Sequence, residues 1–132
     1  MQRSSSLQTP IKRVRGLGAA HSGTHHFLLQ RVSALALIPL ALWFMTEILT
    51  NLLQADRAAV VIWLSDPITA LLMGALVMAL FIHARLGVQT IIEDYIPHEG
   101  KKIALLLLLN AMIYGFGAAA LLAIFKMHFS VI

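Results

Sequence analysis

The chain has 132 residues, of which 59% are hydrophobic and only 12% are charged, and its mean hydropathy is +0.82. Soluble domains carry about 25% charged residues, so this composition excludes an ordinary soluble domain and indicates a membrane protein. The absence of cysteine excludes thiolate metal sites, iron–sulfur ligation by this chain and disulfides.

Residues 1–22 contain Arg, Lys, Ser and Thr but no acid, which predicts a flexible, basic, cytoplasmic tail. The same composition loosely resembles an organellar transit peptide, although the membrane charge rule explains it as well. Ser22 or Thr24 is the expected cap of the helix that follows.

Three apolar runs follow, at about 32–53, 68–92 and 103–125. Each reaches the roughly 20 residues that a helix needs to cross a bilayer, and the alternating pattern of barrel strands is absent. The sequence therefore predicts an all-α membrane domain over residues 23–132 with three transmembrane helices. Because three helices enclose only a thin core, we expect the domain to pack against a second membrane subunit.

Local signals refine these spans. Pro39 is expected to kink the first span, and Glu47 near its end is expected to be a solvated, interfacial acid. Asp66 with the following proline predicts a capped start for the second span, and residues 96–102 predict a tight polar turn. Small residues on the third span predict close helix packing: Gly115, Gly117 and Ala118–Ala120.

The basic residues record topology, since Lys and Arg collect on the cytoplasmic side of short loops. They concentrate before the first and third spans, at Arg3, Lys12, Arg13, Arg15, Arg31, Lys101 and Lys102, whereas Arg57 and Lys126 are alone on the other side. This distribution predicts a cytoplasmic N-terminus in a bacterial inner membrane and argues against nucleic-acid binding.

The second span holds the most informative residues. His83, Gly87, Thr90 and Asp94 share one helical face, and His83 lies roughly 16 Å along the helix from Asp94. A histidine at membrane depth suits three roles: axial ligand of a haem, hydrogen-bond partner of a neighbouring helix, or proton relay. Gly87 leaves room for a flat macrocycle beside the backbone.

Two further side chains on this span have open interpretations. Arg85 can meet a haem propionate, face an acid of a partner subunit, or extend to the headgroups. Tyr95 can anchor the helix at the interface or donate a hydrogen bond to a quinone carbonyl, with Asp94 orienting it or relaying protons.

Two segments together resemble a known family. His83–Tyr95, with a glycine four residues after the histidine and a terminal Asp-Tyr pair, resembles the second helix of the succinate dehydrogenase hydrophobic membrane anchor subunit. Ser22–Ala34 is similar to the start of that family's first helix, and the basic tail resembles its alphaproteobacterial branch. Arg85 departs from the aromatic residue found in some members.

The resemblance implies a complex II subunit that carries no catalytic residues of its own. His83 would be an axial ligand of haem b iron, with the other ligand supplied by a cytochrome b556-type second anchor. Tyr95 would contact ubiquinone and Asp94 would support that site, while His25 and Arg31 would lie near the haem propionates or the iron–sulfur subunit. A flavoprotein subunit would complete the assembly and oxidise succinate.

Other functions fit parts of the pattern. A fumarate reductase anchor that uses menaquinol would have the same fold. A haem-free structural anchor would tolerate loss of His83, and a small transporter subunit would need more polar residues inside its spans than Glu47 and Asn110 supply.

Overall fold

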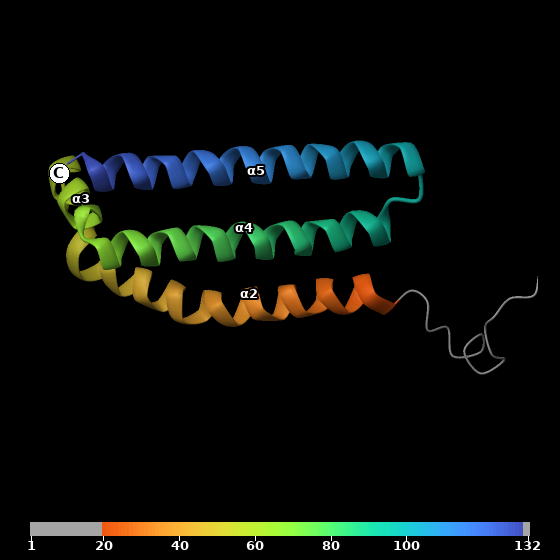
Figure 1. The fold of residues 1–132 in the computed structure, drawn as a ribbon, viewed down its shortest axis with the longest axis horizontal. Helices are drawn as coiled ribbons and strands as arrows, with labels where there is room; N and C mark the ends of the chain where they lie inside the picture. Colours follow the sequence, from red (N-terminus) through yellow and green to blue (C-terminus); the bar gives the residue numbers. More distant parts are fainter. Residues whose placement is uncertain (1–19, 131–132) are drawn as a thin grey trace, which may run out of the picture.

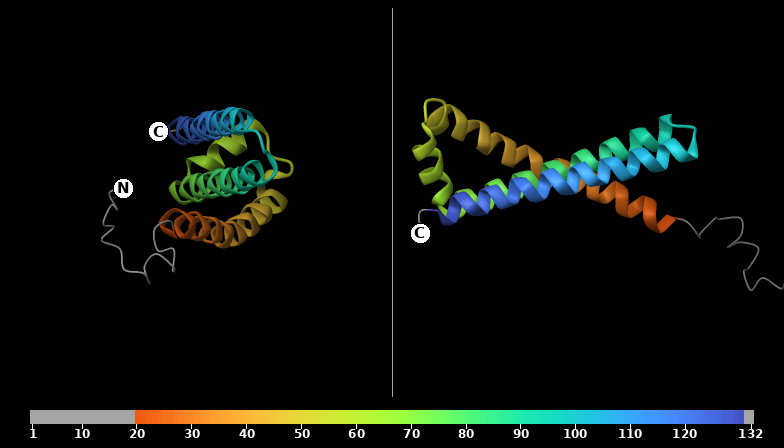
Figure 2. Two further views of the ribbon diagram at one scale, coloured as in Figure 1. Left: turned by 90° about the vertical axis from the view of Figure 1, so that its right-hand side faces the viewer. Right: turned by 90° about the horizontal axis from the view of Figure 1, so that it is seen from above.

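The computed structural model describes residues 20–130, and within that range every regular element is a helix. Three long helices follow one another, and each runs opposite to the one before it: α2 (Ala20–Glu47), α4 (Pro67–Tyr95) and α5 (Glu99–Phe129) (Figure 1). A short helix, α3 (Arg57–Ser65), lies at the end where α2 leads into α4 (Figure 1). Seen end-on, α4 lies between α2 and α5 (Figure 2). The predicted all-α fold with three spans is confirmed.

The first helix begins earlier than the sequence predicted. α2 includes Ala20, so Ser22 and Thr24 lie inside the helix and do not cap its start. The rest of the predicted tail, residues 1–19, lies outside the described residues.

α2 continues through Pro39 as one helix and bows along its length (Figure 1). Proline removes a backbone donor and crowds the preceding turn, which favours bending, but the helix is not interrupted at Pro39, and the kink expected there stays a prediction. After Glu47 the backbone continues as a π-helical turn, Ile48–Leu52. Seen from above, α2 crosses the α4–α5 pair at an angle (Figure 2).

The segment between the first two spans is not the simple loop that the sequence predicted, because it contains α3. The Asp56 carboxylate caps this helix by accepting a hydrogen bond from the Ala59 backbone N–H at 2.8 Å. Trp63 stacks on Trp43 of α2 with ring centroids 6.1 Å apart, and its indole N–H donates to Glu47 Oε2 at 2.8 Å. Glu47 is therefore half-buried and hydrogen-bonded, which corrects the prediction of a solvated acid.

The predicted cap and turn of the second span are confirmed. Asp66 Oδ2 accepts a hydrogen bond from the Thr69 backbone N–H at 2.8 Å, and Pro67 opens α4 where a missing N–H costs nothing. Residues 96–98 alone connect α4 to α5, so these two helices form a tight antiparallel hairpin.

One glycine of the small-residue stripe packs as predicted. A Cβ on Gly117 would lie 3.7 Å from the Phe81 ring of α4, so glycine allows the two helices to approach closely here. Gly115 faces open space, since nothing lies within 4 Å of a Cβ there.

Few side chains are buried between the helices. Among residues 23–130 the buried ones are Leu64, Ala79, Leu86 and Ser33. All three long helices are long and apolar enough to cross a membrane, yet only 6%, 6% and 0% of their most apolar windows are buried in the chain. Lipid or other subunits must therefore cover most of their surface.

Candidate functional site

α4 presents ionisable side chains to two different neighbours. His83 and Arg85 are two residues apart, so at about 100° per residue they point in nearly opposite directions. His83 contacts α2, whereas Arg85 contacts α5. The two side chains therefore cannot serve one site within this chain.

His83 makes a polar contact across the α2–α4 interface. Its Nδ1 lies 3.2 Å from Oγ of Ser33, a side chain only 6% exposed. The Ser33 hydroxyl also donates to the backbone carbonyl of Gln30 at 3.0 Å. Across residues 20–130 no group bonds Nε2 of His83, so the helix-to-helix hydrogen bond leaves one ring nitrogen for a ligand.

A polar pocket opens beside this histidine. It has a volume of about 450 Å³ and is lined by Phe27, Gln30, Arg31, Ala34 and His83. The Arg31 guanidinium lies 5.1 Å from the Phe27 ring centroid, a cation–π contact that holds the charge at the pocket wall. The structure thus brings Arg31 and His83, both selected from the sequence, to one pocket.

The two adjacent histidines of α2 differ in their surroundings. His25 is exposed and does not line the pocket, so its role stays a prediction. His26 is half-buried, and its Nε2 is shielded from solvent without a hydrogen-bond partner among the described residues. The sequence reading missed His26, although its spacing of seven residues from Ser33 places both on one helical face.

Asp94 and Tyr95 lie at the last turn of α4. Tyr95 is 78% exposed and Asp94 is also exposed. Neither side chain makes a hydrogen bond within residues 20–130, so Asp94 does not orient the phenol in the isolated chain. Both groups are free to meet a ligand or another subunit, and their assigned roles stay predictions.

Arg85 has partners that the sequence reading did not consider. Its Nε donates to Asn110 Oδ1 of α5 at 2.8 Å, and its guanidinium lies 5.5 Å from the Tyr114 ring centroid. These contacts replace extension toward the headgroups, and the opposite orientation of His83 separates Arg85 from the Arg31 pocket. The charge is held between α4 and α5 by a neutral amide and an aromatic face.

The described part of the chain offers no multi-ligand metal site. Residues 20–130 contain no group of three His, Asp or Glu side chains placed to hold one ion. Among the residues that line the pocket beside His83, the imidazole is the one side chain with a nitrogen that commonly binds a metal.

Comparison with known proteins identifies the family. Residues 5–125 match the family described as succinate dehydrogenase/fumarate reductase transmembrane subunit. The chain belongs to this family.

Individual relatives agree with that assignment. The chain is 36% identical over 91 residues to the succinate dehydrogenase hydrophobic membrane anchor subunit of Rickettsia bellii, covering 68% of this chain and 71% of the relative. It is 31% identical over 121 residues to the subunit of the same name from Paracoccus denitrificans, covering 90% and 91%. The subunit of the same name from Rickettsia conorii is 30% identical over 105 residues, covering 79% and 82%.

These relationships confirm several predictions. The chain is a membrane anchor subunit of succinate dehydrogenase, a multi-pass protein of the bacterial inner membrane that acts in a complex with other subunits. The alphaproteobacterial resemblance is also confirmed, because Rickettsia and Paracoccus both belong to that group. Membership of this family favours the anchor over the transporter alternative.

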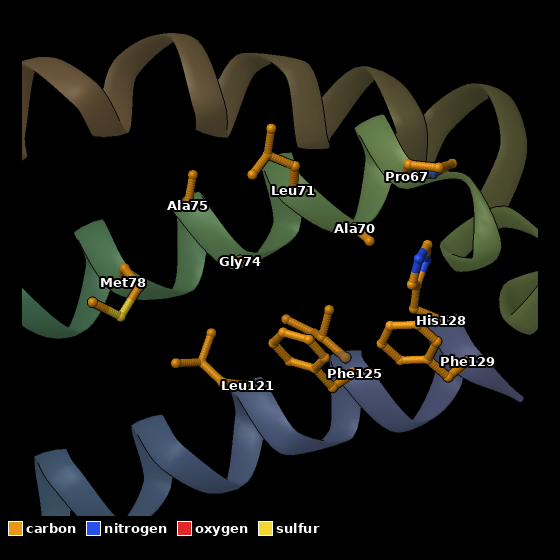
Figure 3. Close-up of a pocket in the computed structure, with 11 residues that line it drawn as sticks. Pro67, Ala70, Leu71, Gly74, Ala75, Met78, Leu121, Phe125, His128 and Phe129 are labelled. Carbon is orange, nitrogen blue, oxygen red and sulfur yellow. The ribbon is translucent and has the colours of Figure 1, made fainter.

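A second groove lies away from the predicted site residues. Figure 3 shows apolar side chains of α4 and α5 facing each other across this groove. Its volume is about 400 Å³. His128 is the one labelled polar ring in this view, and its Nδ1 lies 3.3 Å from the Leu64 carbonyl of α3. This histidine ties α5 to α3, and the groove brings together no cluster of polar groups.

Proposed function

We propose that this anchor binds haem b jointly with a second, cytochrome b556-type anchor and forms part of the ubiquinone site of the complex. The observation that carries the proposal is the pocket that His83 and Arg31 line together on one side of the α2–α4 interface. Electrons from succinate, oxidised on a flavoprotein subunit, would reach the quinone through an iron–sulfur subunit.

The residues at this pocket fit a haem. A neutral imidazole with an unoccupied nitrogen is a suitable axial ligand, and His83 has Nε2 without a hydrogen-bond partner in the described residues. Arg31 supplies a positive charge for a propionate at the same pocket. Nε2 of His26 is a second polar atom that needs a partner from outside the chain. Bound there, haem supplies a one-electron redox centre.

The quinone would bind at the end of α4. The Tyr95 phenol is 78% exposed and unpaired in the described chain, so its O–H is available to donate to a quinone carbonyl. Asp94 lies beside it, exposed, where a carboxylate can orient the bound quinone or pass protons from the aqueous side. Reduction of a quinone consumes two protons, so a site at the membrane edge has a direct supply.

Charge distribution supports the orientation of this end. The start of α2 and the 96–98 connection lie at the same end of the molecule (Figure 1). Arg31, Lys101 and Lys102 lie toward it, and the charge rule assigns it to the cytoplasmic side. The iron–sulfur and flavoprotein subunits would then dock on the side that carries Tyr95, with His25 and Arg31 near that interface.

The names of the relatives favour one direction of catalysis. The family description covers both succinate dehydrogenase and fumarate reductase, whereas the three relatives above are all named succinate dehydrogenase. We therefore infer succinate oxidation in preference to fumarate reduction, and ubiquinone as the acceptor remains what the resemblance implies.

A redox difference spectrum of the purified complex tests the haem assignment. We expect a b-type signal in the dithionite-reduced minus oxidised spectrum of the wild type and its loss or shift in His83→Ala. His128→Ala is the matched control, because that histidine bonds the Leu64 carbonyl of α3 and lies outside the pocket. Wild type without haem, or an unchanged signal in His83→Ala, would contradict the proposal and leave a haem-free anchor.

A further inference from the structure

The contact between Ser33 and His83 has a direction that can be worked out from proton counting. A serine hydroxyl carries one proton, and that of Ser33 is donated to the Gln30 carbonyl at 3.0 Å. The same oxygen lies 3.2 Å from His83 Nδ1. With the hydroxyl proton on the shorter contact, to the Gln30 carbonyl, the oxygen accepts from the ring, and the ring proton then lies on Nδ1.

The other ring nitrogen follows from charge. An imidazole that binds iron is the neutral form, so His83 as a haem ligand carries a single ring proton. With that proton on Nδ1, Nε2 has a free lone pair, which is the form that binds a metal. The opposite arrangement, with the hydroxyl donating to Nδ1, would put the proton on Nε2 and block ligation.

We propose that Ser33 is a positioning residue for the haem ligand: by accepting from His83 Nδ1–H it fixes the tautomer and ring orientation that present Nε2 to iron. This inference rests on the proposed haem site and assigns a residue on a different helix from the ligand. Ser33 is only 6% exposed, so water cannot readily take over the hydrogen bond.

The hydrogen bond also affects the electronics of the ligand. A hydrogen-bond acceptor on the imidazole nitrogen that does not bind iron makes the ring a stronger base, and a stronger base favours ferric over ferrous iron. Ser33 therefore lowers the haem midpoint potential. Loss of such a partner costs about 10-fold to 100-fold in metal affinity in other histidine sites.

The test is a set of variants in the purified complex, followed by haem content, redox titration and the electron paramagnetic resonance spectrum of the ferric haem. Ser33→Ala removes the acceptor while keeping a good helix former, and Ser33→Thr keeps the hydroxyl. Thr46→Ala is the matched control, because Thr46 Oγ1 makes the same type of bond to its own helix, to the Trp43 carbonyl at 2.6 Å, away from His83. Ser33→Cys supplies a weak acceptor if Ser33→Ala assembles poorly.

We expect Ser33→Ala to raise the midpoint potential and lower haem occupancy, with Ser33→Thr and Thr46→Ala close to wild type. If the binding of ferric haem is weakened tenfold and that of ferrous haem is unchanged, the midpoint potential rises by about 59 mV for this one-electron couple. An unchanged potential and spectrum in Ser33→Ala, with haem present in wild type and lost in His83→Ala, overturns this inference alone. Wild type without haem overturns the inference together with the proposed function.

Discussion

The two ends of the molecule differ in whether their polar side chains have hydrogen-bond partners within the chain. We call the half of the chain around the start of α2 and the 96–98 connection the turn end, and the half around α3 the α3 end. At the α3 end Glu47 accepts from Trp63 and from Asn51 Nδ2 at 2.7 Å, and Asp56 and Asp66 both cap helices. All three of these carboxylates have partners within the chain.

At the turn end several polar groups have none among the described residues. Tyr95 and Asp94 are exposed and unpaired, His26 Nε2 is buried and unpaired, and His83 uses only one ring nitrogen. Buried or membrane-embedded polar groups are costly to leave unpaired, so His26 Nε2 and His83 Nε2 indicate partners outside the chain, whereas Tyr95 and Asp94 are exposed and available for one. The α3 end therefore stabilises the fold through contacts within the chain, while the turn end leaves polar groups for the cofactor, quinone and subunits proposed above.

The largest effect is expected from Tyr95→Phe at the turn end, and it concerns the rate of quinone reduction. Removing the phenol O–H takes away the proposed hydrogen bond to a quinone oxygen that gains charge during reduction, and such donors are worth about 10²-fold in rate. We expect succinate-dependent quinone reduction to fall by about that factor, while succinate oxidation with a soluble artificial acceptor is unchanged.

Tyr114→Phe is the matched control for this measurement. Tyr114 lies on α5 with its ring 5.5 Å from the Arg85 guanidinium, and phenylalanine preserves that ring. We expect Tyr114→Phe to retain the wild-type quinone rate. Equal rates in Tyr95→Phe and wild type would mean that Tyr95 is only an interfacial anchor.

A smaller effect, on stability rather than turnover, is expected at the α3 end. Trp63→Ala removes the stack on Trp43 and the hydrogen bond to Glu47, together worth about 2 kcal/mol for half-exposed groups. We expect a lower thermal unfolding midpoint of the purified complex with an unchanged haem spectrum. Trp63→Phe keeps the aromatic stack, so its thermal unfolding midpoint should fall by about half as much as that of Trp63→Ala. A change in the haem spectrum would show that the two ends are coupled.

The sequence predicted what depends on local chemistry. The three spans follow from apolar length, the start of α4 follows from Asp66 and its proline, and the shared face of His83 and Asp94 follows from helical period. The short helix α3 was missed because its 9 residues, Arg57–Ser65, are mostly apolar and too few to establish a helical period.

The contacts between helices were out of reach of the sequence. Whether Ser33 meets His83, and whether Arg85 meets Asn110, depends on where α2 and α5 cross α4, and periodicity does not specify a crossing. A helical serine or threonine commonly bonds its own backbone, so Ser33 gave no signal by itself. His25 was selected over His26 by resemblance, whereas burial distinguishes His26.

The smallest predicted effect concerns the cap of α4 at the α3 end. The Thr69 backbone N–H, which donates to the Asp66 carboxylate at 2.8 Å, holds the pKa of Asp66 below its usual range. An unfolded aspartate has a pKa of about 3.9, so ionised Asp66 stabilises the fold above that pH and loses this contribution as the pH falls through the lower folded pKa. Asp66→Asn keeps a side-chain oxygen to cap the helix but cannot titrate. We therefore expect the thermal midpoint of wild type to fall relative to Asp66→Asn between about pH 5 and about pH 3, with little difference near neutrality. Parallel curves over that range would show that the cap acts only through its geometry. The charge of the solvent-exposed Asp66 carboxylate would then contribute little to the stability of the α3 end.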